Sequence, residues 1–193
     1  MADKAARTKT VVYGGAFNPP TVAHQVIFQE CVDFASENDA DVWILPSGNR
    51  VDKTIAVDRA LRLTYIEAMF TDLREHSVQV DLSTIELDRH RPVETYDTVV
   101  ELAEAHPDRE FIWVFGADST ETMPGWKNGQ WLLDNVHMLL LDRPGSKLNP
   151  AVKTWSPLSV PVMDVSSTEL RHRVQTGKDF RELVSPSVFK LLS

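Results

Sequence analysis

The sequence has very little cysteine and no long apolar run. Its single cysteine, Cys31, excludes an internal disulfide and is typical of a protein from a reducing compartment. Cys31 falls in an amphipathic helical pattern, which predicts a buried structural thiol rather than a nucleophile. No apolar stretch approaches the length that spans a membrane, and segment 1–9 lacks the apolar core of a signal peptide. We therefore expect a cytoplasmic protein.

Basic residues are scarce relative to acidic ones. The 193-residue chain has 20 lysines and arginines against 28 aspartates and glutamates, a formal net charge of -8. This balance argues against a general nucleic-acid-binding protein, which is usually basic. A phosphorylated small molecule would instead need a local positive pocket. The length suits one domain with a sizeable core, and we expect residues 1–193 to form it.

Short apolar runs alternate with amphipathic helical patterns along the chain. This alternation predicts an α/β fold, a parallel sheet with helices on both faces. Strands are expected at Thr10–Tyr13, Asp41–Leu45, Val78–Asp81, Phe111–Phe115, Val136–Leu141 and Val160–Met163. Helices are expected at Thr21–Ser36, Val57–Phe70, Thr95–Ala105, Ser167–Gln175 and Pro186–Leu191. Ligands of such sheets bind beyond the carboxyl ends of the strands, and mobile loops are expected at Ser47–Thr54 and Gly145–Ser159.

The segment Gly14–His24 links the first expected strand to the first expected helix. A strand, a glycine turn and a helix start in this order place backbone N–H groups and the positive end of a helix where a phosphate can dock. Gly14 and Gly15 let the backbone approach a ligand without a Cβ in the way. The segment matches neither of the two common phosphate-loop patterns. It nevertheless predicts a nucleotide site.

His24 is the strongest catalytic candidate in this segment. It can donate a hydrogen bond to a phosphate and stabilise charge that develops during transfer; the alternative is a surface histidine without a role. Thr21 lies one helical turn before it, on the same side of the helix. Thr21 can bind a phosphate oxygen or simply cap the helix.

A second segment, Val165–Arg171, surrounds the start of a late helix. Ser166, Ser167 and Thr168 offer hydroxyls and N–H groups at its positive end, and Arg171 follows where it can clamp a phosphate. The alternative is a plain serine- and threonine-rich helix cap, which by itself is as plausible as a binding site. With the first motif present, the segment predicts binding of a nucleotide phosphate.

Four further candidates lie after strands or in expected loops. Asp118 follows Gly116 at the end of an apolar strand and suits a ribose hydroxyl or a metal-bound water; alternatively it caps the next helix. Trp126 can stack on a flat heterocycle, or pack as an ordinary aromatic residue. Lys53 and Arg143 are candidate phosphate partners, with a solvated surface charge as the default for each.

These motifs resemble those of the nucleotidylyltransferase superfamily. The first is similar to its entry motif, Gly-Gly-x-Phe-Asp/Asn-Pro followed by [His/Thr]-x-Gly-His, and the second to its Ile-Ser-Ser-Thr-x-Ile-Arg. Gly116–Asp118, Trp126 and Arg143–Gly145 occur in the order typical of the nicotinate mononucleotide adenylyltransferases, and Pro92–Thr98 is similar to a motif of that branch. The resemblance covers nearly the whole chain and implies a Rossmann-like fold of the nucleotidylyltransferase type.

The resemblance also implies an activity in NAD biosynthesis: transfer of the AMP moiety of ATP to nicotinate or nicotinamide mononucleotide, with release of pyrophosphate. Magnesium (Mg²⁺) would assist, held mainly by phosphate oxygens and water, so no dedicated protein site for a metal is expected. The catalytic residues implied are His24, Thr21 and Arg171. ATP is expected at Gly14, Gly15, Phe17, Thr21, His24, Gly116, Asp118, Arg143, Ser166, Ser167, Thr168 and Arg171. The mononucleotide is expected at Asn18, Lys53, Thr95, Tyr96 and Trp126.

Three departures from the family pattern leave alternatives open. Ala23 replaces the glycine of the entry motif, Glu94 replaces an aromatic residue, and Pro46–Lys53 is only loosely similar to the family's Pro-x-x-x-Pro-Pro-His-Lys. An acid at position 94 would repel a nicotinate carboxylate if it faced the base. One alternative is a superfamily member with another phosphorylated acceptor, such as phosphopantetheine; the other is a catalytically weak, nucleotide-binding regulatory protein. Assembly into a homo-oligomer stays open in each case.

Overall fold

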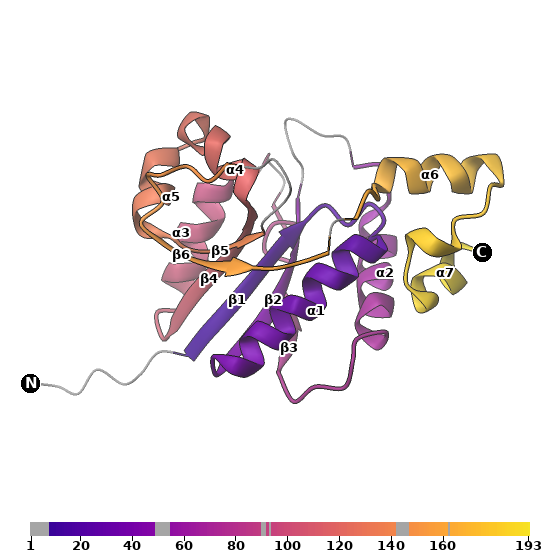
Figure 1. The fold of residues 1–193 in the computed structure, drawn as a ribbon, viewed down its shortest axis with the longest axis horizontal. Coiled ribbons are helices and arrows are strands. Elements are labelled where there is room, and N and C mark those ends of the chain that lie inside the picture. The colour runs from indigo at the N-terminus through magenta and orange to yellow at the C-terminus, as the bar shows by residue number, and fades with distance from the viewer. Residues whose placement is uncertain (1–7, 49–54, 90–91, 93, 142–146, 162) are drawn as a thin grey trace, which may run out of the picture.

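The six strands form one parallel sheet. A computed structural model describes residues 8–48, 55–89, 92, 94–141, 147–161 and 163–193. The strands are β1 (Thr8–Gly15), β2 (Ala40–Pro46), β3 (Val80–Leu82), β4 (Arg109–Gly116), β5 (His137–Leu141) and β6 (Thr154–Leu158). They lie in the order β3-β2-β1-β4-β5-β6 (Figure 1), so the predicted parallel sheet is confirmed. The direction of the strand order reverses between β1 and β4, and open sheets of this type bind ligands at such a point.

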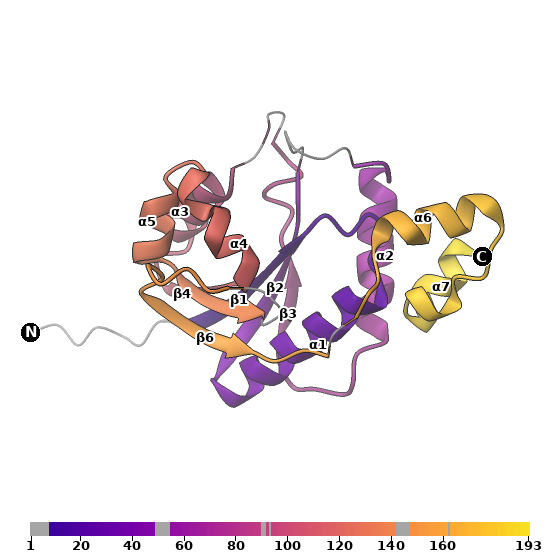
Figure 2. The same cartoon turned by 45° about the horizontal axis from the view of Figure 1, so that its top comes forward.

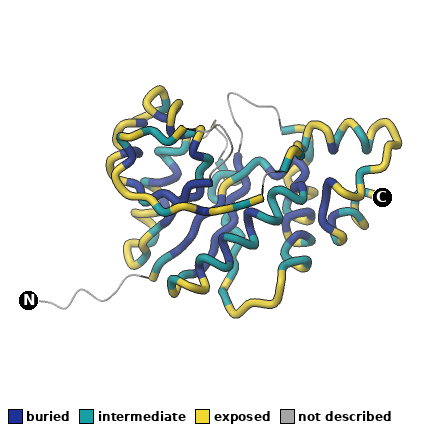
Figure 3. Tube along the Cα trace, in the orientation of Figure 1, coloured by how far each residue is buried: buried dark blue, intermediate teal, exposed yellow. Residues whose placement is uncertain are grey.

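Helices cover both faces of the sheet, as expected. They are α1 (Val22–Glu37), α2 (Arg59–Thr71), α3 (Thr95–Ala105), α4 (Ala117–Thr122), α5 (Gly129–Asn135), α6 (Ser167–Thr176) and α7 (Pro186–Leu192). Adjacent residues of β1 point to opposite faces. Val11 packs in a cluster with α1, α2 and α7, whereas Val12 packs in a second cluster with α3 and α5. Figure 2 shows α6 and α7 lying beyond α2 at the C-terminal end, and Figure 3 shows that the strands are mostly buried.

The last strand lies earlier in the chain than expected. The prediction of a strand at Val160–Met163 is wrong, because β6 ends at Leu158. β6 contains Pro157, which has no N–H to donate and is normally excluded from inner strands. Among the described strands it pairs with β5 alone, so β6 is an edge strand, where proline is tolerated. The prediction of a loop at Gly145–Ser159 is wrong for the residues that form β6. Most of the expected loop Ser47–Thr54 lies outside the described residues.

All five expected helices lie close to their predicted positions, whereas α4 and α5 were not expected. α3 has the bounds that the sequence predicts. α2 begins after Asp58, whose carboxylate accepts a hydrogen bond of 2.8 Å from the N–H of Ala60 and so marks the start of the helix. α4 and α5 have 6 and 7 residues, which is too few for a clear helical period.

Cys31 is fully buried on α1, as predicted for a structural thiol. Burial raises the pKa of its thiol strongly, and the neighbouring Glu30 adds to the rise, so the thiol stays protonated. In the described part of the chain, no helix combines the length and apolar character needed to cross a bilayer.

One carboxylate joins α7 to the end of α2. Asp72 accepts two hydrogen bonds of 2.8 Å from Ser187, one from its backbone N–H and one from its hydroxyl. Burial by itself would raise the pKa of the Asp72 carboxyl. Hydrogen bonds from serines at the start of α7, together with the charge of Lys190, outweigh burial and lower the pKa.

We expect Asp72→Asn to lower the free energy of unfolding by about 1 kcal/mol at pH 7. The substitution replaces a charged hydrogen-bond acceptor by a neutral one, and the partial exposure of the site keeps the loss small. The folded-state pKa lies below the unfolded one, so this contribution is present above the unfolded pKa and is lost as the pH falls through the folded pKa. Urea unfolding of both proteins at pH 7 and pH 3 measures the difference. It should shrink at pH 3; an equal difference at both pH values would contradict this account.

Candidate active site

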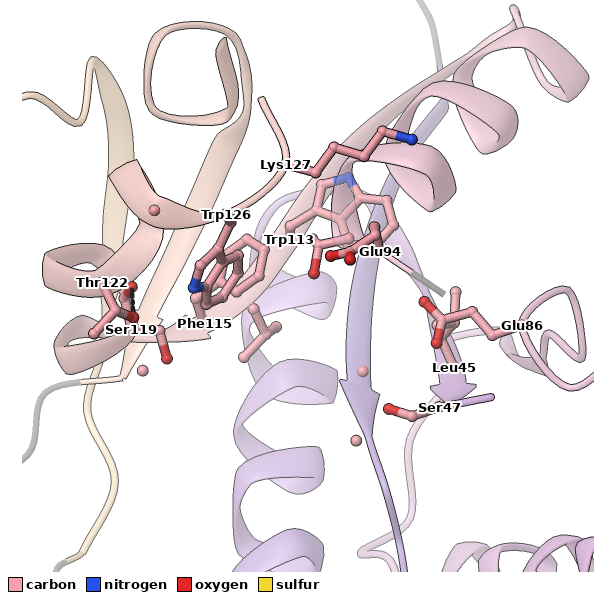
Figure 4. A pocket seen from close by; sticks show the side chains of 16 residues that line it. Leu45, Ser47, Glu86, Glu94, Trp113, Phe115, Ser119, Thr122, Trp126 and Lys127 are labelled. Carbon is pink, nitrogen blue, oxygen red and sulfur yellow. Dashed lines mark hydrogen bonds between the residues drawn. The ribbon is translucent and has the colours of Figure 1, made fainter. Parts of the chain in front are cut away.

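A cavity of about 670 Å³ lies at the carboxyl ends of β1, β2 and β4. Its described lining also includes the turn after β3, the start of α3 and the segment before α5 (Figure 4). Five residues that the sequence predicts for ATP or the acceptor lie in this lining: Gly14, Gly15, Thr95, Gly116 and Trp126. The fold therefore brings four separate stretches of the sequence to one cavity.

The glycine turn after β1 is shaped by Phe17. The ring of Phe17 is fully buried and packs against Tyr13 and His24, with ring centroids 5.5 and 5.2 Å away. A Cβ at Gly15 would come within 3.0 Å of this ring, so glycine gives Phe17 the space to fold back. Phe17, a predicted ATP contact, thus lies in the core and supports the turn from within.

Thr21 and His24 form one hydrogen-bonded unit at the start of α1. Nδ1 of His24 accepts a hydrogen bond of 3.1 Å from the backbone N–H of Thr21, and lies 2.8 Å from the Thr21 hydroxyl. Thr21 is 1% exposed and His24 is half-buried, so the pair is largely shielded from water. A ring nitrogen that accepts from an amide carries no proton, so the neutral imidazole carries its proton on Nε2. His24 can therefore donate from Nε2 to an acceptor such as a phosphate oxygen.

The two motif segments, far apart in the sequence, contact each other. The Ser167 hydroxyl donates to the carbonyl of Pro19 at 2.8 Å, and the Arg171 guanidinium donates to the carbonyl of Asn18 at 2.6 Å. Arg171 also donates to the Thr168 hydroxyl at 3.2 Å. The N-terminus of α6 is thereby fixed against the loop between β1 and α1 (Figure 1).

Two predicted binding residues have structural partners. Ser166 is the N-cap of α6, and its hydroxyl accepts from the N–H of Glu169 at 3.1 Å. The helix-cap interpretation therefore describes Ser166. Asn18 is 6% exposed, and its Oδ1 accepts from the N–H of Val57 at 2.8 Å, which ties the β1–α1 loop to the segment before α2.

The aromatic residues predicted for the acceptor are divided between two places. Trp126 lines the cavity and packs edge-on against Phe115, with ring centroids 6.3 Å apart. Tyr96 lies outside the described lining and packs edge-on against Trp131 at 5.2 Å, between α3 and α5. Trp126 is thus the aromatic candidate whose ring a bound heterocycle can reach directly.

Charged side chains of the described lining are mostly acidic. Glu86 and Glu94 line the cavity together with Lys127 (Figure 4). Lys127 donates to Asp97 at 2.5 Å, so its charge is compensated by a carboxylate. The described lining alone therefore offers little net positive charge to an anionic substrate.

Three further predicted residues are not part of the described lining. Asp118 is exposed in the first turn of α4, with its carboxylate folded back beside Gly116, and Ser119 of the same helix lines the cavity. Lys53 and Arg143 lie outside the described residues.

The sequence predictions do not include Glu86, Lys127 or Arg62. Glu86 follows the carboxyl end of a strand, which is a signal that could have identified it. Lys127 follows Trp126 and could have been found with it. Arg62 lies inside α2 in a helical pattern like any other, and only the folded chain places it behind the glycine turn.

The chain matches known sequences over most of its length. The family model described as Cytidylyltransferase-like matches residues 12–173. A protein of Exiguobacterium sibiricum, named as a probable nicotinate-nucleotide adenylyltransferase, is 32% identical over 186 residues, which cover 95% of each chain. A protein of the same name from Geobacillus thermodenitrificans is 31% identical over 180 residues, covering 93% of this chain and 81% of its own.

Solved structures share the fold. The nicotinic acid mononucleotide adenylyltransferase of Plasmodium falciparum, in complex with NaAD, matches with a TM-score of 0.78 at 19% identity, over 95% of this chain and 93% of its own. The same protein in complex with APC matches with a TM-score of 0.76 at 18% identity, over the same shares. The predicted Rossmann-like fold is confirmed.

We expect the neutral His24 ring to be protonated on Nε2, because Nδ1 accepts from the amide of Thr21. Long-range ¹H–¹⁵N spectra of the imidazoles at pH 8 measure this. His76 is the matched control: its Nδ1 contacts the carbonyl of Val78 at 3.0 Å and must donate, which favours the opposite tautomer. A His24 ring that carries its proton on Nδ1 would refute the arrangement.

Proposed function

We propose that this chain, which belongs to the nicotinate-nucleotide adenylyltransferase family, transfers the AMP moiety of ATP to nicotinate or nicotinamide mononucleotide. The products are a dinucleotide of NAD biosynthesis and pyrophosphate. The observation that supports this best is the contact between the two motif segments, which holds the N-terminus of α6 against the β1–α1 loop. That contact places two potential phosphate-binding elements beside one another at the switch point of the sheet.

The reaction needs no covalent bond to the protein. An oxygen of the mononucleotide phosphate attacks the α-phosphorus of ATP and forms the new P–O bond. The bond from the α-phosphorus to the bridging oxygen breaks, and pyrophosphate leaves with the electron pair. The protein must align two anions and stabilise the charge of the transferred group.

We assign the stabilising donor to Nε2 of His24. Thr21 holds the imidazole through Nδ1, so the donor is oriented before the substrate binds and needs no reorganisation during the reaction. The N-terminus of α6, a helix of 10 residues, supplies the partial positive charge that suits a triphosphate. Arg171 adds a full charge while it keeps the β1–α1 loop in place.

A divalent cation fits this site as a companion of ATP. Among the described residues, no group of three or more histidine, cysteine, aspartate or glutamate side chains could hold a metal ion. Mg²⁺ is commonly held by substrate phosphates and water with few protein ligands, and in that form it neutralises part of the triphosphate charge. We therefore propose that Mg²⁺ enters with the nucleotide.

The walls of the cavity support a flat, cationic heterocycle as the acceptor base. The pyridinium ring of either mononucleotide carries a positive charge, which the face of Trp126 can stabilise. The carboxylates of Glu86 and Glu94 attract the same ring. Glu94 disfavours the additional carboxylate of nicotinate, so this side chain bears on the choice between the acid and the amide.

The activity is tested by pyrophosphate release from ATP with nicotinate mononucleotide, nicotinamide mononucleotide and phosphopantetheine as acceptors. We expect turnover with at least one pyridine mononucleotide. His24→Ala should lower kcat by about two to four powers of ten while the protein stays folded, as is typical when a preorganised donor is lost. The exposed His76, changed to alanine, is the control and should leave kcat unchanged. Turnover of phosphopantetheine alone would reject the proposed acceptor, and an active His24→Ala protein would remove His24 from the mechanism.

Removal of the Glu94 charge should raise kcat/KM for nicotinate mononucleotide relative to nicotinamide mononucleotide. We expect Glu94→Gln to raise the ratio of kcat/KM for nicotinate over nicotinamide mononucleotide by about three- to tenfold, since a like charge at a solvent-screened site is removed. Glu121→Gln, an exposed glutamate of α4 outside the described lining, is the control. A ratio that does not move would mean that Glu94 has no influence on the base.

A further inference from the structure

Arg62 is a buried arginine directly behind the glycine turn. It lies on α2 and is 3% exposed. One of its terminal nitrogens donates to the carbonyl of Ala16 at 2.8 Å and to the carbonyl of Ser47 at 2.9 Å. Ala16 follows β1 and Ser47 follows β2, and the ends of these strands are paired in register. A single cation therefore bridges the two chain segments that leave the sheet at the cavity.

Among the residues that the structure describes, the charge of Arg62 is poorly compensated. No described carboxylate forms an ion pair with it, and its Nε is buried without a hydrogen-bond partner. Burial, and then the neighbouring charge of Arg59, lowers the pKa of the guanidinium, although Asp58 partly opposes this. Burial of a poorly compensated cation costs free energy. Neutral donors could satisfy the same two carbonyls without that cost, so the positive charge itself points to a further role.

Arg62 lies behind the part of the cavity that we assign to the acceptor. Ser47 lines the cavity, and the N–H of Gly48, which belongs to the same peptide group as the Ser47 carbonyl, donates to Glu86 at 3.2 Å. Glu86 in turn accepts from the hydroxyl of Thr98 on α3, at 2.9 Å. α3 begins at Thr95, which we place at the acceptor. The α6 contacts, by contrast, are made further along the β1–α1 loop.

The described lining cannot by itself attract a second anion beside ATP. It carries Glu86 and Glu94, and its lysine, Lys127, is paired with Asp97. The mononucleotide phosphate must nevertheless approach the triphosphate closely before the reaction. A positive charge behind the backbone offsets these acids without blocking the space that the substrate occupies.

We propose that Arg62 is a positioning residue for the phosphate of the acceptor: it fixes the ends of β1 and β2 and supplies the buried positive charge behind them. It acts through the peptides of Ala16 and Ser47. A carbonyl that accepts from a cation polarises its peptide, so the N–H of Phe17 becomes a stronger donor and the N–H of Gly48 binds the Glu86 carboxylate more firmly. This inference rests on the proposed function and extends it to a residue inside α2.

The test compares binding and turnover in Arg62→Met, Arg62→Lys and the unchanged protein. Calorimetry measures the affinity for nicotinate mononucleotide, for nicotinamide mononucleotide and for ATP, each alone. We expect Arg62→Met to weaken mononucleotide binding about tenfold and ATP binding less than threefold, because the lost charge lies nearer the acceptor phosphate. Arg62→Lys keeps the charge and should recover mononucleotide affinity to within about threefold of the unchanged protein.

Arg109→Met is the matched control. Arg109 is also partly buried, but it pairs with Asp41 at the opposite ends of the strands and lies over the ring of Trp43. Its loss should lower stability, measured by urea unfolding, and leave all three affinities unchanged. Equal losses of mononucleotide and ATP affinity in Arg62→Met, or an Arg62→Lys protein as weak as Arg62→Met, would overturn the proposal.

Binding and turnover also separate this inference from the proposed function. If the unchanged protein binds a pyridine mononucleotide but releases no pyrophosphate, the proposed function fails while the affinities still decide the role of Arg62. If it binds neither mononucleotide, both are rejected.

Discussion

Two hydrogen bonds join the N-terminus of α6 to the loop between β1 and α1, and the rest of the site is arranged around them. Ser167 and Arg171 reach back across most of the sequence to the carbonyls of Pro19 and Asn18. The same loop is fastened on its other side by Asn18 to the segment before α2. The loop therefore has one fixed path, and His24 at the following helix start has one fixed orientation.

Two tasks fall to different groups of the site: donation of hydrogen bonds to the nucleotide and compensation of negative charge. In the proposed mechanism, donors to the nucleotide come from a helix end and from an imidazole whose tautomer is set by a backbone amide. The compensating charge at the ends of β1 and β2 comes from behind, from Arg62. Acidic groups at the surface of the cavity can then select among acceptor bases without a net loss of attraction for phosphate.

Features that depend on neighbouring residues were predictable from the sequence, and features that depend on the fold were not. The strand–glycine–helix order located the turn at Gly14, and the apolar runs located the inner strands of the sheet, because these patterns are local. β6 escaped prediction because Pro157 is acceptable only at an edge, and the edge is set by the order of all strands. Ser166 was ambiguous for a related reason: a cap and a phosphate ligand have the same local sequence, and only its bond to Glu169 distinguishes them. Arg62 carries no local signal at all, since its partners lie in two other segments.

The late position of α6 in the chain has a consequence for biosynthesis. The strands of the sheet, the turn at Gly14 and His24 are all synthesised before Ser167 leaves the ribosome. A growing chain can thus assemble its sheet while the β1–α1 loop still lacks the two bonds that fix it. On the proposed function, nucleotide affinity is acquired only after α6 has emerged, so a chain stalled before Ser167 is not expected to sequester ATP.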